Sequence, residues 1–417
     1  MTEGPLSVVA IADTDSYVKW TAALLGALPA GSDADLLIVE TPLAVSAAQQ
    51  EAALARSGIE ASRVRRVEFD DLDSVLRELA PDAVVVAARG PVVRVLIGVV
   101  AALDPRPVIV SGLPGISIPA TTAALVHRTQ SDLFVLHSRR EVEAFSNLAQ
   151  RRGLAQRFGL ARLPFADSGS AADVSPPGGT DLVFASQAIV PRERADRLRV
   201  ARVLVDAARA NPAKRVVLKE RASAGEHQTH AQRHGYPDLL RRLGPLPSNL
   251  VVSTEAMSQA LDSAEGLVTV SSTAAIEAVA RGIPVIALDS FGVDDKLINT
   301  VFVGSGLLGS EGSVIARDFR HPARGWLDDN YFHDPTADDW VAQIGQLVVL
   351  RRAGALPPKP ARVRRGGRVR DVWERKLALG RKDRSLAGAA VWVIIVPLRV
   401  VLRPILRPYY RRRLTPG

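Results

Sequence analysis

The sequence contains no cysteine and lacks several short motifs that anchor common enzyme classes. Without cysteine the chain can form no disulfide, thiolate metal site or cysteine nucleophile. GxGxxG does not follow the first predicted strand, and GxxxxGK[S/T], GxSxG and HExxH are absent. Dehydrogenases, P-loop ATPases, α/β-hydrolases and zinc metalloproteases therefore lose their usual signatures.

Basic charge is scarce in most of the chain and is concentrated at its C-terminal end. The formal net charge is +9, but residues 351–417 hold 19 basic and 3 acidic residues, a net of +16. Residues 1–350 then hold 34 basic and 41 acidic residues, a net of −7. Because general nucleic-acid binding needs a basic surface, we expect no nucleic-acid partner for this mildly acidic body.

The length of 417 residues predicts two folded domains, since a single core seldom exceeds about 250–300 residues. Hydrophobic residues make up 47% of the chain, enough for both cores. The N-terminus has neither the charged start nor the long apolar core of a signal peptide, so we expect a cytoplasmic body.

Short apolar segments alternate with helical patterns in both halves of the chain. The predicted strands are Leu6 to Ala12, Leu36 to Val39, Val64 to Phe69, Ala83 to Ala88, Val108 to Ser111 and Asp132 to Ser138, then Leu182 to Ala185, Val216 to Leu218, Leu250 to Val252, Leu267 to Val270 and Ile283 to Leu288. This alternation predicts an α/β protein with a doubly wound parallel sheet in each half. We expect two Rossmann-like domains that face a cleft at the carboxyl ends of their strands.

Changes in composition predict the domain boundaries. Small residues, proline and glycine fill residues 166–180, which we interpret as a linker between an N-terminal domain, 1–165, and a C-terminal domain, 181–352. Residues 353–385 are predicted to be a basic connector, because the stretch from Pro357 to Arg370 has no apolar period.

Residues 386–413 have the composition of a helix that lies in a membrane interface. Residues 386–398 are uncharged, but as a helix they would extend only about 20 Å, short of the roughly 30 Å core of a bilayer. Arginines at i, i+4 and i+8 would share one helical face, with aromatic residues before and after them. The residues expected at the membrane are Trp392, Arg399, Arg403, Arg407, Tyr409 and Tyr410. The alternatives are a terminal helix packed on the body and a nucleic-acid-binding arm.

Residues 266–292, GLVTVSSTAAIEAVARGIPVIALDSFG, contain the most informative pattern: a strand, a short helix and a parallel strand. Ser272 or Thr273 would cap the helix, and Gly282 would end it in a left-handed conformation. Free backbone N–H groups at such a helix start suit a phosphate, and the hydroxyls of the Ser-Ser-Thr turn add donors. A plain N-cap is the alternative.

A polar loop, KERASAGEHQTH, follows a predicted strand at residues 219–230. Cations at the carboxyl end of a strand suit an anionic ligand, and Arg221 could bind a phosphate with two parallel hydrogen bonds. The alternative is a solvated loop with unrelated charges. His227 and His230 have no third ligand at a fixed spacing, so we predict no metal site.

Three residues of the first half are candidates for the acceptor side. Asp15 follows the first strand and could act as a general base toward an acceptor hydroxyl, or it could simply start a helix with Ser16. Lys19 could meet an anionic acceptor or face solvent. Arg128 ends a stretch punctuated by glycine and proline, which would line the acceptor side or form a loop with a helical end.

The segment SSTAAIEAVARGIPVIALDSFG resembles the nucleotide-binding stretch of GT-B glycosyltransferases, especially bacterial capsule-polysaccharide transferases and CDP-glycerol glycerophosphotransferases. The matching residues are Ser271, Ser272, Thr273, Glu277, Gly282 and Pro284. The resemblance implies that the Ser/Thr turn holds the donor phosphate and that Glu277 contacts the ribose or sugar, without a metal motif. The Lys-x-His-Pro of the family is replaced by Lys219-Glu220-Arg221, so only Lys219 is carried over.

The combined prediction is a metal-independent GT-B glycosyltransferase at the inner face of the cytoplasmic membrane. It would move a sugar or polyol phosphate from an activated nucleotide to a lipid-linked or cell-envelope glycan, with no cofactor besides this donor. The predicted base is Asp15, the predicted donor-binding residues are Lys219, Arg221, Glu226, His230, Ser271, Ser272, Thr273 and Glu277, and the acceptor-side residues are Lys19 and Arg128. The alternatives are a UDP-sugar 2-epimerase-like enzyme and a non-catalytic GT-B-like membrane scaffold.

Overall fold

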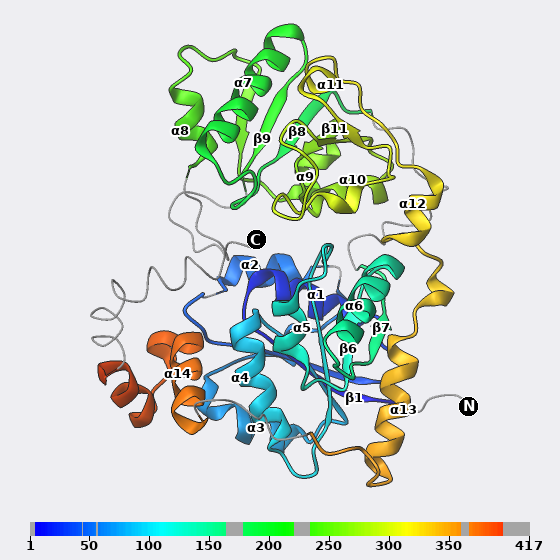
Figure 1. The fold of residues 1–417 in the computed structure, drawn as a ribbon, viewed down its shortest axis with the longest axis vertical. Helices are drawn as coiled ribbons and strands as arrows, with labels where there is room; N and C mark the ends of the chain where they lie inside the picture. The colour runs from blue at the N-terminus through cyan, green and yellow to red at the C-terminus, as the bar shows by residue number, and fades with distance from the viewer. Residues whose placement is uncertain are drawn as a thin grey trace. The chain divides into compact units, whose positions relative to one another are not determined.

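A computed structural model describes residues 5–43, 45–55, 57–163, 178–220, 234–359 and 367–394 (Figure 1). The first sheet consists of β1 (Ser7–Ala12), β2 (Asp33–Val39), β3 (Val64–Val67), β4 (Ala83–Ala87), β5 (Val108–Gly112), β6 (Leu133–Leu136) and β7 (Phe158–Leu160). The second consists of β8 (Asp181–Ala185), β9 (Val216–Lys219), β10 (Leu250–Ser253), β11 (Ala264–Thr269), β12 (Val285–Leu288) and β13 (Leu308–Gly309). The strand orders are β3-β2-β1-β4-β5-β6-β7 and β10-β9-β8-β11-β12-β13.

Helices separate the strands along most of the chain. In the first half they are α1 (Asp15–Gly26), α2 (Ala47–Leu54), α3 (Leu72–Leu79), α4 (Gly90–Ala101), α5 (Thr122–Arg128) and α6 (Arg139–Arg151). Later helices are α7 (Arg194–Ala210), α8 (Tyr236–Arg241), α9 (Met257–Asp262), α10 (Ala274–Ala280), α11 (Glu311–Ile315), α12 (Arg324–Asp329), α13 (Trp340–Arg352) and α14 (Gly367–Leu379). Short 3₁₀ turns lie at Ala61–Arg63, Phe69–Asp71, Thr300–Phe302, Pro335–Ala337 and Gly380–Lys382.

The predicted α/β architecture with two parallel sheets is confirmed. In β1, Ser7 lies opposite Asp33 of β2, and in β8, Leu182 lies opposite Val216 of β9, both in parallel register. The central strands read as continuous apolar runs because helices cover both faces of a parallel sheet. The strands β7 and β13 were not predicted, since three and two residues are too few to show a period.

The chain divides into two compact units, which we describe separately: unit 1 comprises residues 1–111, 130–132 and 344–417, and unit 2 comprises residues 112–129 and 133–343. In unit 1, apolar residues of β1, β2 and β4 pack with α3 and α4. In unit 2, one core lies around α9, α10 and α12, and another lies around α7 and α8. The rings of Phe134, Phe145 and Phe158 form a smaller cluster. Residues 164–177, most of the predicted linker, lie outside the described residues.

The structure corrects the prediction of a connector at residues 353–385, because α14 lies there and packs beside α4 in unit 1 (Figure 1). Ala378 and Leu379 belong to the unit 1 core. The Glu374 carboxylate lies 3.1 Å from the Arg94 guanidinium. The apolar face of α14 is short and is interrupted by charged residues, which hides its period in the sequence.

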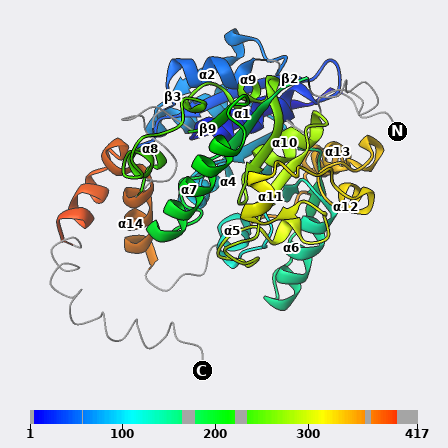
Figure 2. The same ribbon diagram turned by 90° about the horizontal axis from the view of Figure 1, so that it is seen from above.

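Residues 380–385 continue this packed segment, and a largely exposed helix follows at residues 386–394. Arg375 bridges Asp70 and Asp383, at 2.7 and 3.0 Å, and its guanidinium lies 4.7 Å from the Phe69 ring centre. Residues 386–394 are helical (Figures 1 and 2). The ring of Trp392 stacks on Trp373 at a centroid distance of 5.8 Å. Residues 367–385 therefore form part of folded unit 1.

Candidate functional site

The Ser-Ser-Thr turn lies in unit 2, at the carboxyl end of β11. Ser271 is buried, and its backbone N–H donates to the side-chain oxygen of Gln187 at 2.9 Å. The Gln187 amide nitrogen donates in turn to the Ser271 hydroxyl at 3.0 Å. Because Gln187 follows β8, the strand next to β11, this reciprocal pair fixes the turn against its neighbouring strand.

A second hydroxyl supports the same turn from inside. Thr269 donates from its hydroxyl to the Ala185 carbonyl at 3.2 Å and accepts from the Ser272 N–H at 3.1 Å. The Ser272 hydroxyl accepts from the Ala274 N–H at 3.2 Å. Thr273 is the N-cap of α10 but makes no side-chain cap bond. The Thr273 hydroxyl is therefore not needed to start the helix.

The C-terminus of α10 has the predicted geometry. Gly282 has a φ of +67°, its N–H donates to Val279 O at 3.0 Å, and the Ile283 N–H donates to Ala278 O at 2.9 Å. This pair of bonds is the Schellman arrangement, in which a left-handed glycine ends the helix. The prediction for Gly282 is confirmed.

Glu277 has a local partner in the structure. Its carboxylate lies 3.3 Å from the guanidinium of Arg281, one turn later in α10. Arg281 also contacts the Asp262 carboxylate at 3.0 Å and donates to the Ser258 carbonyl at 2.9 Å. A donor that reached Glu277 would have to compete with this partly buried ion pair.

Lys219 is the last residue of β9 and is buried. Its ammonium donates to the carbonyl of Glu220, and the Glu220 carboxylate accepts from the Ser186 hydroxyl at 3.1 Å. Lys219 thus ends β9 and Gln187 follows the neighbouring strand β8, at the edge of the sheet that carries the Ser-Ser-Thr turn. The predicted residues Arg221, Glu226, His227 and His230 lie outside the described part of the chain.

Arg197 of α7 supports the loop that presents Gln187, and sequence reasoning missed both residues. The buried guanidinium donates to the carbonyls of Gln187 at 2.6 Å, Ala188 at 2.7 Å and Pro191 at 2.8 Å. It also lies 5.2 Å from the Tyr236 ring centre. An arginine in a helix and a glutamine after a strand have no sequence signal of such roles, because their partners come from distant segments.

The first loop of unit 1 contains a partly buried ion pair beside the predicted base. Asp15 is the first residue of α1 and accepts a 3.4 Å bond from the Ser16 hydroxyl, while Lys19 is exposed. Asp13 is buried and lies 3.0 Å from the Arg89 guanidinium and 3.3 Å from its backbone N–H. Burial raises the pKa of the Asp13 carboxyl, and Arg89 opposes that shift. The neighbouring positions of β1 and β4 could have suggested this pair.

The structure corrects the acceptor-side interpretation of Arg128. The residue is only 1% exposed, and its guanidinium donates to the carbonyls of Gly112 at 3.0 Å and Ala124 at 3.2 Å. It lies 5.6 Å from the Phe134 ring centre. A side chain held in the core in this way braces α5 and cannot reach an acceptor without unfolding its surroundings.

Of the residues predicted at the membrane, Trp392 is described and is 42% exposed. Arg399, Arg403, Arg407, Tyr409 and Tyr410 lie outside the described residues. Within residues 5–394, as far as they are described, no helix combines the length and apolar character needed to cross a bilayer. The same residues contain no cluster of three or more His, Asp or Glu arranged to hold a metal ion.

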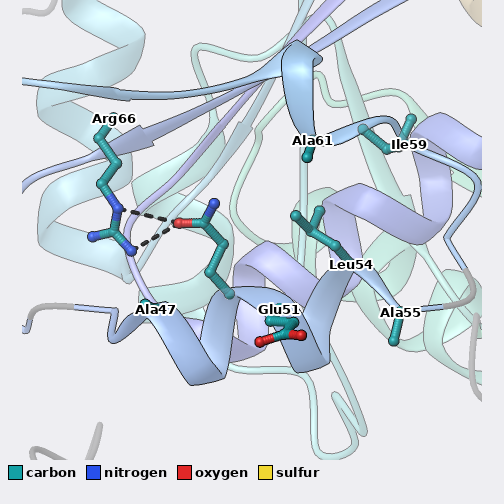
Figure 3. A pocket seen from close by; sticks show the side chains of 8 residues that line it. Ala47, Glu51, Leu54, Ala55, Ile59, Ala61 and Arg66 are labelled. Atoms are coloured by element: carbon teal, nitrogen blue, oxygen red, sulfur yellow. Dashed lines mark hydrogen bonds between the residues drawn. The ribbon is translucent and has the colours of Figure 1, made fainter.

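Two cavities lie away from the Ser-Ser-Thr turn. One, of about 670 Å³, is in unit 1 beside α2, where Arg66 donates to the Gln50 side chain at 2.8 and 3.1 Å (Figure 3). Glu51 and apolar side chains, among them Leu54 and Ile59, line the rest of it. The other, of about 370 Å³, is in unit 2 near Asp181 and Ser263. Neither includes a residue that we predicted for the site.

Comparison with solved structures shows the fold. The structure described as "putative UDP-N-acetylglucosamine 2-epimerase from Listeria monocytogenes" is similar with a TM-score of 0.55 and 11% identity, over 87% of this chain and 100% of that one. The Methanocaldococcus jannaschii UDP-GlcNAc 2-epimerase in complex with UDP-GlcNAc and UDP has a TM-score of 0.52 and 14% identity, over 81% and 99%. At these identities the likeness establishes a two-domain, GT-B-like fold.

Comparison of sequences shows the family. No curated protein matches the chain significantly. The family described as "Putative glycosyltransferase (DUF6716)" matches residues 8–347, which include both sheets and the Ser-Ser-Thr turn. The resemblance to GT-B glycosyltransferases seen in the sequence is thereby confirmed, and the chain belongs to this glycosyltransferase family.

Proposed function

We propose that the chain transfers a sugar or polyol phosphate from a nucleotide-activated donor, held at the Ser-Ser-Thr turn, to a lipid-linked or cell-envelope glycan. The observation that carries this proposal is the Gln187–Ser271 pair, which fixes the turn at the carboxyl end of β11. Ser272 and Thr273 beside it are only partly buried. Fixed hydroxyl and backbone donors at this edge suit the phosphate oxygens of a nucleotide.

The remaining site residues take proposed roles around this turn. Lys219 adds positive charge beside the donor phosphates, together with Arg221, Glu226 and His230 in the loop that follows. Glu277 contacts the ribose or sugar once its ion pair with Arg281 is broken. Asp15 accepts the proton of the acceptor hydroxyl, with Lys19 one turn later on the acceptor side, and no metal ion or cofactor takes part.

A nucleotide-binding panel tests the donor site. Isothermal titration of the full chain with UDP, CDP, GDP and CMP should identify at least one ligand, and Ser272→Ala/Thr273→Ala should weaken its binding by about tenfold or more. Ser310→Ala is the matched control, because Ser310 caps α11 with its hydroxyl in the same unit. Unchanged binding by the double variant would refute the assignment, and a parent that binds no nucleotide would favour the scaffold alternative.

A UDP-sugar 2-epimerase-like activity is the second candidate, favoured by the similarity of the fold to UDP-GlcNAc 2-epimerase structures. The two reactions differ in their need for an acceptor. Incubation with UDP-GlcNAc alone, followed by analysis of the sugar product, separates them. An epimerised nucleotide-sugar formed without acceptor would support the epimerase and would contradict the transferase.

We also propose that residues 386–413 attach the protein peripherally to the anionic inner face of the cytoplasmic membrane. The helix 386–394 leaves Leu386, Val393 and Ile394 exposed by 89%, 70% and 67%. Several nearby cations are already paired with unit 1, such as Lys382 with Glu40 and Arg384 with Glu68. The apolar side chains and the basic residues after 394 therefore supply the attachment.

Flotation of the full chain with phosphatidylglycerol-containing vesicles tests this attachment. Val393→Asp/Ile394→Asp should lower the recovered fraction several-fold, because the two carboxylates oppose insertion and are repelled by the lipid. Val349→Asp is the control, since Val349 is 62% exposed in α13. Equal recovery of the double variant and the parent would contradict the proposal.

A further inference from the structure

A loop from another part of unit 2 lies directly against the Ser-Ser-Thr turn. A Cβ atom at Gly115 would lie 3.1 Å from the Thr273 hydroxyl oxygen and 3.7 Å from its methyl carbon. Ile118, three residues later, is buried in one core with Ala274 and Ala275 of α10. The loop from Pro114 to Ser117 thus packs on the first residues of the turn and helix proposed to hold the donor.

This loop is held by one buried carboxylate. Glu141 of α6 is completely buried and accepts three hydrogen bonds: from the Ser117 N–H at 2.7 Å, the His137 N–H at 2.9 Å and the Tyr331 hydroxyl at 2.7 Å. Ser117 also donates from its hydroxyl to the Gly115 carbonyl at 3.0 Å, which closes the loop on itself. Glu141 therefore joins the loop to α6 and to the segment after α12.

The pKa shifts of Glu141 and Tyr331 favour a persistent hydrogen bond from the Tyr331 hydroxyl to the Glu141 carboxylate. Burial raises the pKa of Glu141, but the bonds from Tyr331 and the two N–H groups act in the opposite direction. Burial and the Glu141 charge raise the pKa of Tyr331, so its hydroxyl remains a donor. Because both residues are buried, water cannot replace the bond when it is removed.

Further contacts tie α6 to the same part of unit 2. Arg140 donates to the carbonyls of Thr300 and Val301 at 3.0 Å each, and the Trp326 indole donates to Val301 O at 2.8 Å. The guanidinium of Arg139 in α6 lies 2.8 Å from the carboxylate of Asp328 in α12. Both helices are labelled in Figure 1. The support of the loop is thus anchored at several points, and Glu141 is the point that reaches the loop itself.

The loop also carries donors that the described residues do not use. The backbone N–H groups of Gly115 and Ile116 make no hydrogen bond with another described residue, and both residues are partly exposed. Gly115 lies against Thr273, whose hydroxyl makes no cap bond. Such a group of neutral donors suits the diphosphate oxygens of a nucleotide.

We propose that Glu141 and Tyr331 are positioning residues of the nucleotide-sugar site, which hold the Pro114–Ser117 loop against Thr273 so that the loop forms one wall of the diphosphate site. This inference rests on the proposed function. It adds a second element to the donor site and makes Gly115 a position where a side chain would narrow that site.

UDP binding by the full chain tests the inference. Tyr331→Phe and Glu141→Gln should each weaken UDP binding by about tenfold at a temperature well below unfolding, because a loosened loop no longer holds its donors in place. The control is Asn249→Ala, since the Asn249 amide donates to the carbonyls of Ala208, Asn211 and Lys214 in the same unit. Asn249→Ala should lower the melting temperature and leave the Kd for UDP unchanged. If Glu141 and Tyr331 had only a structural role, their variants would show this same result.

Gly115→Ala probes the loop without disturbing the buried pair. The added methyl group meets Thr273 at 3.1 Å and should weaken UDP binding with little loss of stability. Gly325→Ala is its control, because a Cβ at Gly325 meets nothing within 4 Å. Parent-like UDP affinity in Tyr331→Phe, Glu141→Gln and Gly115→Ala would overturn the inference alone. If the panel identifies CDP, GDP or CMP instead, that nucleotide replaces UDP in these titrations. A parent that binds none of the four would overturn the proposed donor site and this inference with it.

Discussion

Buried polar side chains in this protein connect segments that are distant in the sequence, and His137 is the clearest case at the scale of a residue. Its ring is completely buried, with Nδ1 2.8 Å from the Ala161 carbonyl and Nε2 3.0 Å from the Leu113 carbonyl. Only the protonated ring could donate to both carbonyls. Burial nevertheless dominates and lowers the pKa of His137 to about 4, although the carbonyls and Asp338 act in the opposite direction.

The His137 pKa predicts a loss of stability in mild acid. The unfolded chain binds a proton at His137 near pH 6.5, whereas the folded protein does so only near pH 4. Stability from this group is therefore complete above pH 6.5 and is lost as the pH falls toward 4, by up to about 3 kcal/mol. Urea unfolding between pH 4 and 7.5 should show this slope in the parent and a flatter one in His137→Gln. His321→Gln, at an exposed histidine, should keep the parental slope.

At the scale of an element, α14 shows how a helix rich in charged residues becomes part of a core. Leu379 is completely buried in unit 1, whereas Leu377, two residues earlier in the same helix, is 49% exposed. Since residues two apart do not share a helical face, the two leucines lie in different environments. The ion pairs of Glu374 and Arg375 lie between the helix and unit 1 and help to fix its position.

Two matched leucine substitutions in α14 should differ in their effect. Leu379→Ala removes buried methyl groups and leaves a cavity, so it should lower the free energy of unfolding by about 2–4 kcal/mol. Leu377→Ala should change it by less than about 0.5 kcal/mol, because the side chain is half exposed. Urea midpoints of both variants, compared with the parent, provide the measurement. Equal effects would contradict the packing of α14 as we describe it.

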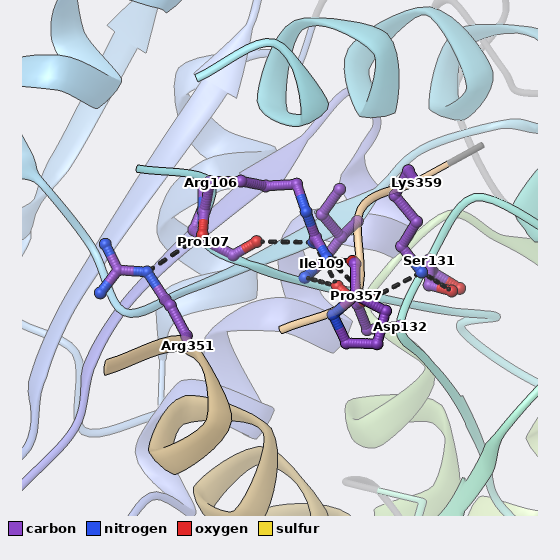
Figure 4. Close-up of polar contacts among 8 residues, drawn as sticks. All are labelled: Arg106, Pro107, Ile109, Ser131, Asp132, Arg351, Pro357 and Lys359. Carbon is purple, nitrogen blue, oxygen red and sulfur yellow. Dashed lines mark hydrogen bonds and ion pairs between the residues drawn. The ribbon is translucent and has the colours of Figure 1, made fainter. Parts of the chain in front are cut away.

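At the scale of the whole molecule, the chain returns to unit 1 through a group of partly buried charges (Figure 4). Asp132 accepts from the Ile109 N–H at 2.7 Å and lies 2.7 Å from the Arg106 guanidinium and 2.6 Å from the Lys359 ammonium. Arg351 donates to the Arg106 carbonyl at 3.1 Å. These contacts join the segment after α13 to β5 and its preceding loop, and they use part of the basic charge that follows residue 351.

Removing the charge of Asp132 should weaken this closure. Asp132→Asn leaves the partly buried Arg106 and Lys359 cations without their counter-ion, and we expect a loss of about 2 kcal/mol in unfolding free energy. Asp33→Asn breaks a pair with Arg63 that is 68% exposed on the aspartate side, and it should cost less than about 1 kcal/mol. Chemical denaturation of the two variants distinguishes these outcomes. If Asp132→Asn lowers the unfolding free energy no more than Asp33→Asn does, the charges around Asp132 contribute little to stability.

The sequence alone determined the two parallel sheets, the Ser-Ser-Thr turn after β11 and the left-handed Gly282. Each depends on local properties: apolar runs for buried strands, hydroxyls before a helix, and a residue that accepts positive φ. The same locality explains why the match of residues 271–284 to GT-B glycosyltransferases could be read before the fold was known.

Only the tertiary structure decided which polar residues meet. Gln187 reaches Ser271 across 84 positions, and Tyr331 reaches Glu141 across 190. The fold also assigned Arg128 to the core and α14 to unit 1, against the sequence interpretation. The spacing of apolar residues in the sequence shows which face of a helix or strand is buried. The partner of a buried charge depends on the crossing of distant segments, which no local pattern contains.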